Sequence, residues 1–218
     1  MKNRKKQFAV LGLGRFGASV AMHLSRMGHE VLAVDSDEML VAALAPHVTQ
    51  AIQADATDEA ALAEMEIGSF DAAVVAIGTN SRASILVTVL CKEAGVPLVI
   101  AKAEDELHAK VLRKVGADRV VFPERDMGQR VARTLDAPNI IDLIELSGEH
   151  RIAEIIAPEK WCGRTLMDIN VRRDYGLTVI GIRRDERFIA SPGADAVLRN
   201  GDILLVLGRT KEIEAVGE

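Results

Sequence analysis

The stretch Phe8-Ala-Val-Leu-Gly12-Leu-Gly14-Arg15-Phe16-Gly17 decides the fold of this 218-residue chain. Its first four residues are apolar and predict a buried strand, and its glycines have the spacing Gly-x-Gly-x-x-Gly. A helix is predicted to follow and to end at Gly28. The face of this helix expected to pack on the strand consists of apolar residues at helical spacing, namely Phe16, Val20, Leu24 and Met27.

A second predicted strand, Glu30 to Val34, completes a β-α-β unit and leads directly to Asp35. The glycines suit a phosphate: Gly12 permits a tight turn, Gly14 lets the phosphate approach the main chain, and Gly17 lets the helix pack closely. The helix N-terminus offers free N–H groups. Asp35 follows Gly17 by 18 residues, near the spacing of about 20 residues at which an acid accepts hydrogen bonds from ribose hydroxyls. The unit therefore predicts a nucleotide site.

Arg15 lies inside the glycine loop, and its role is open on sequence alone. A guanidinium at this position can pair with phosphate oxygens through two hydrogen bonds. It can equally be an exposed surface arginine.

Predicted strands and helices alternate as far as residue 135, including a helix from Glu104 to Val115 with Leu107 on its inner face. Most of these strands are continuous apolar runs, as in a parallel sheet covered on both faces. We predict a Rossmann-like, doubly wound α/β sheet of order 3-2-1-4-5-6. Ligand contacts gather at the C-terminal ends of such strands, where the turns include residues 77–80. The predicted rim residues are Gly12, Gly14, Arg15, Phe16, Gly17, Asp35, Ser36, Asp55, Ala56, Thr57, Ile77, Gly78, Asn80, Lys102 and Glu124.

The rhythm changes after residue 136. We predict one domain from residue 1 to 140 and a second, small α+β domain from residue 141 to 218. In the second domain, Arg151 to Ala157 alternates like a strand and Thr165 to Asn170 predicts one or two helical turns. This domain is too small to be the main body of an enzyme.

Composition excludes several classes of partner. The net charge is −5 and aromatic residues make up 3% of the chain, so nothing predicts nucleic-acid binding. No apolar run approaches the ~20 residues of a membrane span. Cys91 and Cys162 are isolated and predict reduced thiols in a cytoplasmic protein.

The chain shows a nucleotide site without an evident catalytic apparatus. Its five histidines are scattered, and metal-binding spacings, a nucleophile elbow and a phosphate-binding Walker sequence are missing. This combination predicts a sensor and not an enzyme, in which the nucleotide favours one conformation over another. An NAD-dependent oxidoreductase remains the alternative, because the glycines and Asp35 are compatible with both.

These features resemble the RCK (or KTN) domains of regulatory subunits of bacterial Ktr potassium uptake systems. The resemblance spans almost the whole chain. The segments that carry it are Phe8 to Gly17, Arg26 to Asp35, Val75 to Gly78, Gly116 to Arg119, Pro123 to Gly128 and Asn170 to Gly176.

The resemblance implies a cytoplasmic regulator that lies at the inner face of the membrane through a membrane-embedded, KtrB-like potassium-translocating subunit. It implies a dimer-based octameric ring that ATP activates and ADP inactivates, with NAD(H) as the alternative ligand of Trk-type regulators. By position, Arg15 would reach the terminal phosphate, Asp55, Ala56 and Thr57 would flank the adenine, and Lys102 would lie nearby. Glu124 would join a Na⁺ or Mg²⁺ site by the phosphates, or else be an ordinary acid in the first turn of a helix.

The C-terminal part of such subunits often binds cyclic di-AMP at a dimer interface, and a symmetric ligand suits a twofold axis. By position, the resemblance implies a site at Ile169, Asn170, Arg172, Tyr175, Ile180 and Pro192. Arg172 could meet a phosphate. The apolar members of this set could equally be core residues.

Overall fold

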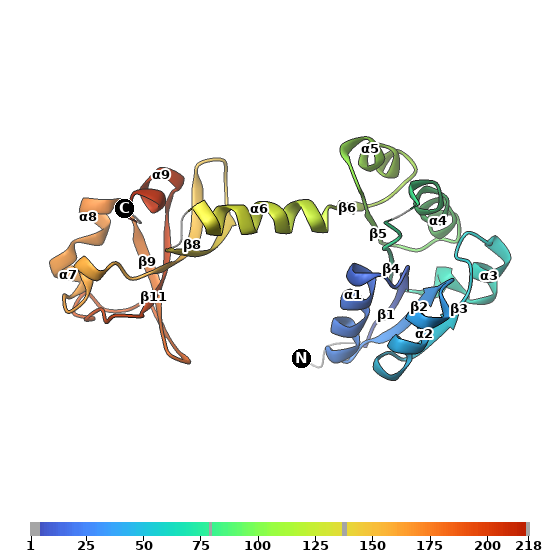
Figure 1. Cartoon of the computed structure of the whole chain (residues 1–218), viewed down its shortest axis with the longest axis horizontal. Coiled ribbons are helices and arrows are strands. Elements are labelled where there is room, and N and C mark those ends of the chain that lie inside the picture. Colours follow the sequence, from blue (N-terminus) through green and yellow to red (C-terminus); the bar gives the residue numbers. More distant parts are fainter. Residues whose placement is uncertain (1–4, 79, 137–138, 217–218) are drawn as a thin grey trace. The chain divides into compact units, whose positions relative to one another are not determined.

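The computed structural model describes residues 5–78, 80–136 and 139–216. The chain divides into two compact units, Met1–Pro123 and Glu124–Glu218 (Figure 1). The division falls at the start of helix α6 (Pro123–Asp136), whereas the sequence predicts a domain boundary at residue 140. Helix α6 belongs to the second unit in the structure and to the first domain in the prediction. The boundary at residue 140 stays a prediction.

The first unit is a six-stranded parallel sheet of order β3-β2-β1-β4-β5-β6, which confirms the predicted fold class and strand order. Alternate residues of β1 face different cores: Ala9 and Leu11 pack into one apolar cluster, and Val10 packs into another. Both faces are therefore covered, which explains the continuous apolar runs. The strands are β1 (Gln7–Leu11), β2 (Glu30–Asp35), β3 (Gln50–Gln53), β4 (Ala72–Val75), β5 (Val99–Lys102) and β6 (Arg119–Val121).

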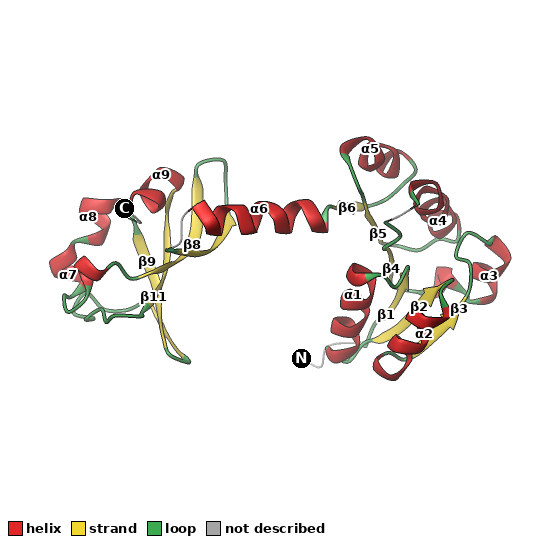
Figure 2. Cartoon of the chain, viewed as in Figure 1, coloured by secondary structure: helices red, strands yellow, loops and turns green. Residues whose placement is uncertain are grey.

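Helices connect these strands and flank the sheet (Figure 2). Asp37, Asp58, Asn80 and Asp105 each cap one of them by accepting a hydrogen bond from a main-chain N–H of the first turn. The helices are α1 (Arg15–Arg26), α2 (Glu38–Leu44), α3 (Glu59–Glu64), α4 (Ser81–Glu93) and α5 (Glu106–Lys114), with 3₁₀ turns η1 (Ala45–His47) and η2 (Ile67–Ser69).

Two predicted inner-face residues of this unit are exposed. Met27 is 68% exposed because α1 ends at Arg26, and Ala21 with Gly17 forms the buried stripe of that helix. Leu107 is 72% exposed, and His108 is buried on α5 in its place. The apolar periodicity predicted both helices correctly, but it assigned one exposed residue to the inner face of each helix.

The second unit contains a five-stranded antiparallel sheet of order β10-β9-β11-β8-β7, which confirms a small C-terminal α+β domain. Its core contains Trp161, which is fully buried. The strands are β7 (Ile140–Glu145), β8 (His150–Ile156), β9 (Thr178–Arg184), β10 (Arg187–Ala190) and β11 (Ile203–Arg209), and the helices besides α6 are η3 (Glu159–Trp161), α7 (Leu166–Ile169), α8 (Val171–Tyr175) and α9 (Thr210–Ala215).

A buried ion pair fixes the loop before β11. Arg184 donates two hydrogen bonds to the Asp202 carboxylate, at 2.8 and 2.7 Å, and one to the carbonyl oxygen of Val197 at 2.9 Å. Asp202 is 1% exposed and also accepts from the N–H of Arg199 at 2.8 Å. Burial by itself raises the pKa of Asp202, but the bonds from Arg184 and Arg199 together hold it below its ordinary value.

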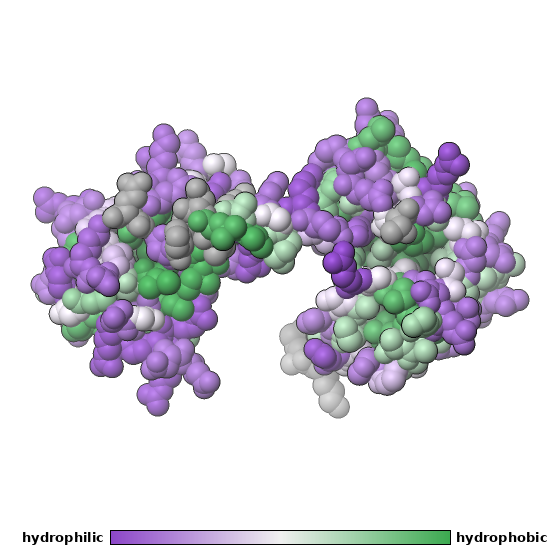
Figure 3. Space-filling model, in the orientation of Figure 1, coloured by the Kyte–Doolittle hydropathy of each residue, from purple (hydrophilic) through white to green (hydrophobic). Residues whose placement is uncertain are grey.

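Helix α6 carries an apolar stripe that its own unit leaves exposed. Met127, Val131 and Leu135 are spaced four residues apart and are 55%, 51% and 77% exposed. Figure 3 shows apolar surface along the part of α6 that lies beside the five-stranded sheet. Residues at this spacing form one face of a helix, so the stripe is continuous.

Candidate functional site

The glycine loop joins β1 to α1 at the C-terminal edge of the parallel sheet. Gly12 has φ +97°, which favours glycine, and its N–H donates to the carbonyl oxygen of Val34 at 2.8 Å. A Cβ on Gly17 would overlap that same Gly12's carbonyl oxygen, whereas a Cβ on Gly14 would meet nothing within 4 Å. The loop thus needs Gly12 and Gly17 for its own packing and leaves the main chain at Gly14 open.

The first turn of α1 leaves its donors available. The N–H of Ala18 bonds the carbonyl oxygen of Gly14 at 2.9 Å and is the first bond of the helix. The N–H groups of Arg15, Phe16 and Gly17 therefore have no acceptor within the helix. Together with the partial positive charge of the helix end, these groups can bind an anion such as a phosphate.

Asp35 ends β2 beside this loop, and the fold already uses both of its carboxylate oxygens. Oδ2 accepts from the N–H of Leu13 at 2.6 Å, and Oδ1 accepts from the N–H of Asp37 at 2.9 Å. Neither bond was predicted from the sequence. The Asp35-Ser36-Asp37 spacing did contain a signal for the second, because aspartate often accepts from the N–H two residues later.

The turn after β3 brings Asp55 to the same edge of the sheet. Its Oδ1 accepts from the hydroxyl of Thr57 at 2.7 Å and from the N–H of Thr57 at 2.9 Å, and these bonds lower the pKa of Asp55. Ala56 is buried between them. Asp58 is the cap of α3, and Thr57 belongs to the turn. The turn is held by these two hydrogen bonds and presents the exposed carboxylate of Asp55.

The turns after β4 and β5 meet at Lys102. A Cβ on Gly78 would lie 2.8 Å from Lys102 Nζ, so the ammonium group covers Gly78 closely. Ile77 is partly buried against the core of the sheet. Its main-chain nitrogen lies close to Gly12, because a Cβ added to Gly12 would be 3.0 Å from it. Thr79, within the predicted turn of residues 77–80, lies outside the described residues. Lys102 thus brings a positive charge to the edge where the glycine loop ends.

The remaining predicted rim residues lie in different surroundings. Arg15 and Ser36 are exposed, and Phe16 is half-buried against the core beneath α1. Asn80 accepts from the N–H of Ala83 at 3.1 Å, so the fold uses it as the cap of α4. Glu124 lies in the first turn of α6 at the start of the second unit. Its cation-binding role stays a prediction, and no cluster of three metal-ligating residues occurs among the described residues.

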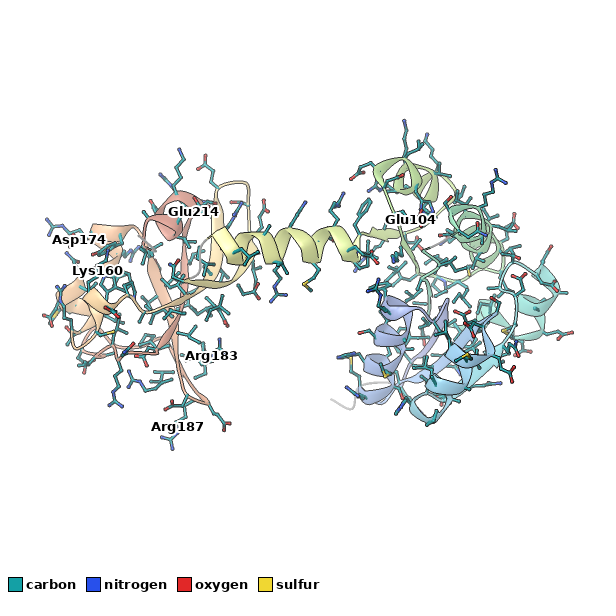
Figure 4. The ribbon with its side chains drawn as sticks, in the orientation of Figure 1. Glu104, Lys160, Asp174, Arg183, Arg187 and Glu214 are labelled. Carbon is teal, nitrogen blue, oxygen red and sulfur yellow. The ribbon has the colours of Figure 1, made fainter. Side chains whose placement is uncertain are left out.

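The second candidate site lies on the helical side of the C-terminal unit. Ile169 is 3% exposed and belongs to the core. Asn170 adopts a left-handed conformation between α7 and α8, and Tyr175 packs edge-to-face on Trp161 with ring centroids 4.8 Å apart. Arg172 is exposed. Figure 4 shows Lys160 and Asp174 on this side of the unit and Arg187 at the tip of the β9–β10 hairpin.

The other two members of this candidate site, Ile180 and Pro192, are half-buried. They lie near each other where β10 ends, because the N–H of Ser191 donates to the carbonyl oxygen of Ile180 at 2.8 Å. Helix α8 separates this pair in sequence from Ile169 and was not predicted.

The described residues contain no helix with the length and apolarity needed to cross a bilayer.

Comparison with family models covers both units. The TrkA-N domain model matches residues 8–123, and the TrkA-C domain model matches residues 151–218. The chain belongs to the TrkA family of potassium uptake proteins. It is 44% identical to Ktr system potassium uptake protein C of Bacillus subtilis over 96% of this chain and 95% of that protein. It is 41% identical to Ktr system potassium uptake protein A of Vibrio alginolyticus over 95% and 94% of the two chains. The resemblance to the Ktr family is thereby confirmed.

Solved structures support the fold of this TrkA-family chain. The RCK domain of GsuK covers all of this chain and 48% of its own, with a TM-score of 0.69 and 18% identity. A GsuK channel bound to NAD covers 99% of this chain and 39% of its own, with a TM-score of 0.67 and 18% identity. At this identity the likeness shows the fold alone, which is that of an RCK domain.

Proposed function

We propose that this chain is the nucleotide-sensing regulatory subunit of a potassium uptake system, with ATP activating and ADP inactivating a membrane-embedded translocating subunit. The observation that carries the proposal is the open glycine loop, with three free N–H groups at the start of α1 beside Asp35 and Lys102. The near full-length similarity to Ktr system proteins gives the transport context. The chain acts as a sensor and not as an enzyme.

In this proposal Gly12, Gly14 and Gly17 form the phosphate loop and Arg15 reaches the terminal phosphate of ATP. An exposed guanidinium inside the glycine loop has the reach and the bidentate geometry for this. Asp55, Ala56 and Thr57 flank the adenine. Glu124 contributes to a Na⁺ or Mg²⁺ site, because a carboxylate beside a triphosphate needs a cation to offset their repulsion.

NAD(H) is the alternative ligand. The glycine loop and Asp35 suit a dinucleotide as well as ATP, and the GsuK fold is known bound to NAD. An NAD(H)-sensing regulator would keep the gating role and change the signal. An NAD-dependent oxidoreductase is the alternative from another functional class, and turnover of a simple hydroxy or keto substrate would support it.

The proposed partners are the translocating subunit and further copies of this chain, assembled from dimers into an octameric ring at the inner face of the membrane. The exposed stripe Met127, Val131 and Leu135 on α6 supports self-association, because exposed apolar faces of this kind mark protein contacts. Particle masses of the wild type and of Val131→Asp test this. Gln129→Asp, on the same helix away from the stripe, is the control.

Cyclic di-AMP is the proposed ligand of the C-terminal unit, at Ile169, Asn170, Arg172, Tyr175, Ile180 and Pro192. The exposed Arg172 supports a phosphate contact. The buried position of Ile169 favours a core role for that residue.

Calorimetric titration with ATP, ADP and NADH, each with and without Mg²⁺, tests the proposal. We expect tight ATP and ADP binding and weak NADH binding. Tight NADH with weak ATP would contradict the ATP assignment and favour the NAD(H)-sensing regulator. Glu124→Gln should abolish the strengthening of ATP binding by the cation, whereas Asp126→Asn, in the same helical turn, should preserve it.

A further inference from the structure

We propose that Asp35 is a positioning residue of the phosphate loop, which it holds through the main chain of Leu13. This inference rests on the proposed nucleotide site and adds to it, because the spacing of Asp35 predicts only a ribose contact. The juxtaposition that carries it is the 2.6 Å hydrogen bond between the N–H of Leu13 and Asp35 Oδ2.

Two consecutive N–H groups of the loop bond to the end of β2. Gly12 donates to the carbonyl oxygen of Val34 at 2.8 Å, and Leu13 donates to the side chain of Asp35. The side chain of Leu13 is 1% exposed and packs into the core beneath α1. Leu13 is therefore fixed at both its side chain and its N–H.

The carboxylate of Asp35 is itself fixed. Its Oδ1 accepts from the N–H of Asp37 at 2.9 Å, which sets the direction of Oδ2 toward the loop. Asp37 in turn caps α2 by accepting from the N–H of Met39 at 2.8 Å. A chain of short bonds thus links the start of α2 to the glycine loop.

The position of Leu13 determines where the anion-binding groups point. Gly14 follows directly, caps α1 and accepts the first bond of the helix from Ala18 at 2.9 Å. Any displacement of Leu13 moves Gly14 and the free N–H groups of the next three residues. A carboxylate has about four lone-pair sites, so Asp35 can hold Leu13 and still accept from a ribose hydroxyl.

Asp35→Asn tests the role. An amide has one acceptor oxygen for the two N–H groups that Asp35 satisfies, and its NH₂ would face the other as a second donor. Asp37→Asn removes the same charge two residues away and keeps a good helix cap, so it is the matched control. Both variants, and the wild type, are examined as the full chain.

The first measurement is amide hydrogen exchange at Leu13 by NMR without ligand. We expect protection in the wild type and in Asp37→Asn, and exchange at least about tenfold faster in Asp35→Asn, in line with loss of a charge-assisted bond. A Leu13 amide that exchanges like an unprotected peptide in the wild type would overturn the proposal without any variant. Unchanged exchange in Asp35→Asn would also overturn it.

The second measurement compares ATP with inorganic tripolyphosphate, which has the phosphates but no ribose. If Asp35 positions the loop, Asp35→Asn weakens tripolyphosphate as well as ATP, by about fivefold or more, and any further loss for ATP alone measures a ribose contact. Weaker ATP with unchanged tripolyphosphate would identify a ribose contact alone and refute the positioning role. If the wild type binds neither ligand, the nucleotide proposal fails, while the exchange measurement still decides whether Asp35 holds Leu13.

Discussion

The two candidate sites of this chain differ in how many of their groups remain available to a ligand once the chain has folded. At the glycine loop, the packing of Gly12 and Gly17 leaves three N–H groups free at the start of α1. On the helical side of the C-terminal unit, Ile169 is buried and Tyr175 packs on Trp161, so Arg172 is the exposed, charged member of the candidate site. The first site is formed before any ligand arrives, and we expect the second to need a further copy of the chain to complete it.

The largest effect is expected from a substitution in the glycine loop itself. Gly17→Ala places a methyl group on the carbonyl oxygen of Gly12, and we expect a loss of about 3 kcal/mol or more of stability together with ATP binding. Gly14→Ala is the control, because its methyl group meets nothing and φ is −60°. It should change stability by less than about 0.5 kcal/mol while still weakening ATP, because the methyl group occupies the path of a phosphate.

The rate at which a thiol reagent labels Cys91 measures how often the first unit opens, and so compares the stability of the two variants. Cys91 is fully buried, and burial raises the pKa of its thiol to about 12, so a thiol reagent should reach it only when the unit opens. A Cys162→Ser background removes the other, half-buried thiol. Equal labelling rates of Cys91 in Gly17→Ala and Gly14→Ala would contradict the packing argument.

The second prediction affects the C-terminal unit and should leave nucleotide binding unchanged. Asp202→Asn removes the charge that three donors satisfy, and we expect a loss of about 2–3 kcal/mol. Trp161 is the single tryptophan and is buried in this unit, so its fluorescence reports the unfolding. Asp195→Asn, exposed in the preceding loop, is the control. Coupled loss of ATP affinity would show that the two units are not independent.

Acid should reproduce part of this effect. The pKa of Asp202 is lower in the folded chain than its ordinary value of 3.8, so its stabilising contribution is fully present above that value. The contribution is lost as the pH falls through the folded-state pKa. Wild type should therefore lose more stability than Asp202→Asn between neutral pH and about pH 3, measured by Trp161 fluorescence.

The third prediction sharpens the role of Arg15 at the preformed site. Arg15→Ala should weaken ATP by about tenfold, as expected for a lost charge-assisted contact, and leave ADP unchanged, because ADP lacks the terminal phosphate. Arg26→Ala, exposed at the other end of α1, should affect neither nucleotide. Equal loss of ATP and ADP in Arg15→Ala would contradict its assignment to the terminal phosphate.

The contrast between the sites also explains what the sequence could predict. Glycine spacing and apolar periodicity are local, so the parallel sheet, its order and the edge that carries the loop were predictable. The bond from Leu13 to Asp35 and the burial of His108 depend on side chains that meet only after folding. In the C-terminal unit, the helix α8 was missed, because its five residues, Val-Arg-Arg-Asp-Tyr, show no apolar repeat at helical spacing.

The smallest expected effect sharpens the second site. Arg172→Ala should weaken cyclic di-AMP by about fivefold, because an exposed arginine contacting a phosphate is well solvated before binding and gains little from the contact. Arg173→Ala removes the same charge from the next residue of α8, which faces a different direction on the helix, and is the matched control. Calorimetric titration of the two variants separates a specific phosphate contact from a general electrostatic effect, because only the latter weakens both equally. If neither variant changes the affinity, the ligand does not contact α8, and the exposed face of that helix serves only to keep the unit solvated.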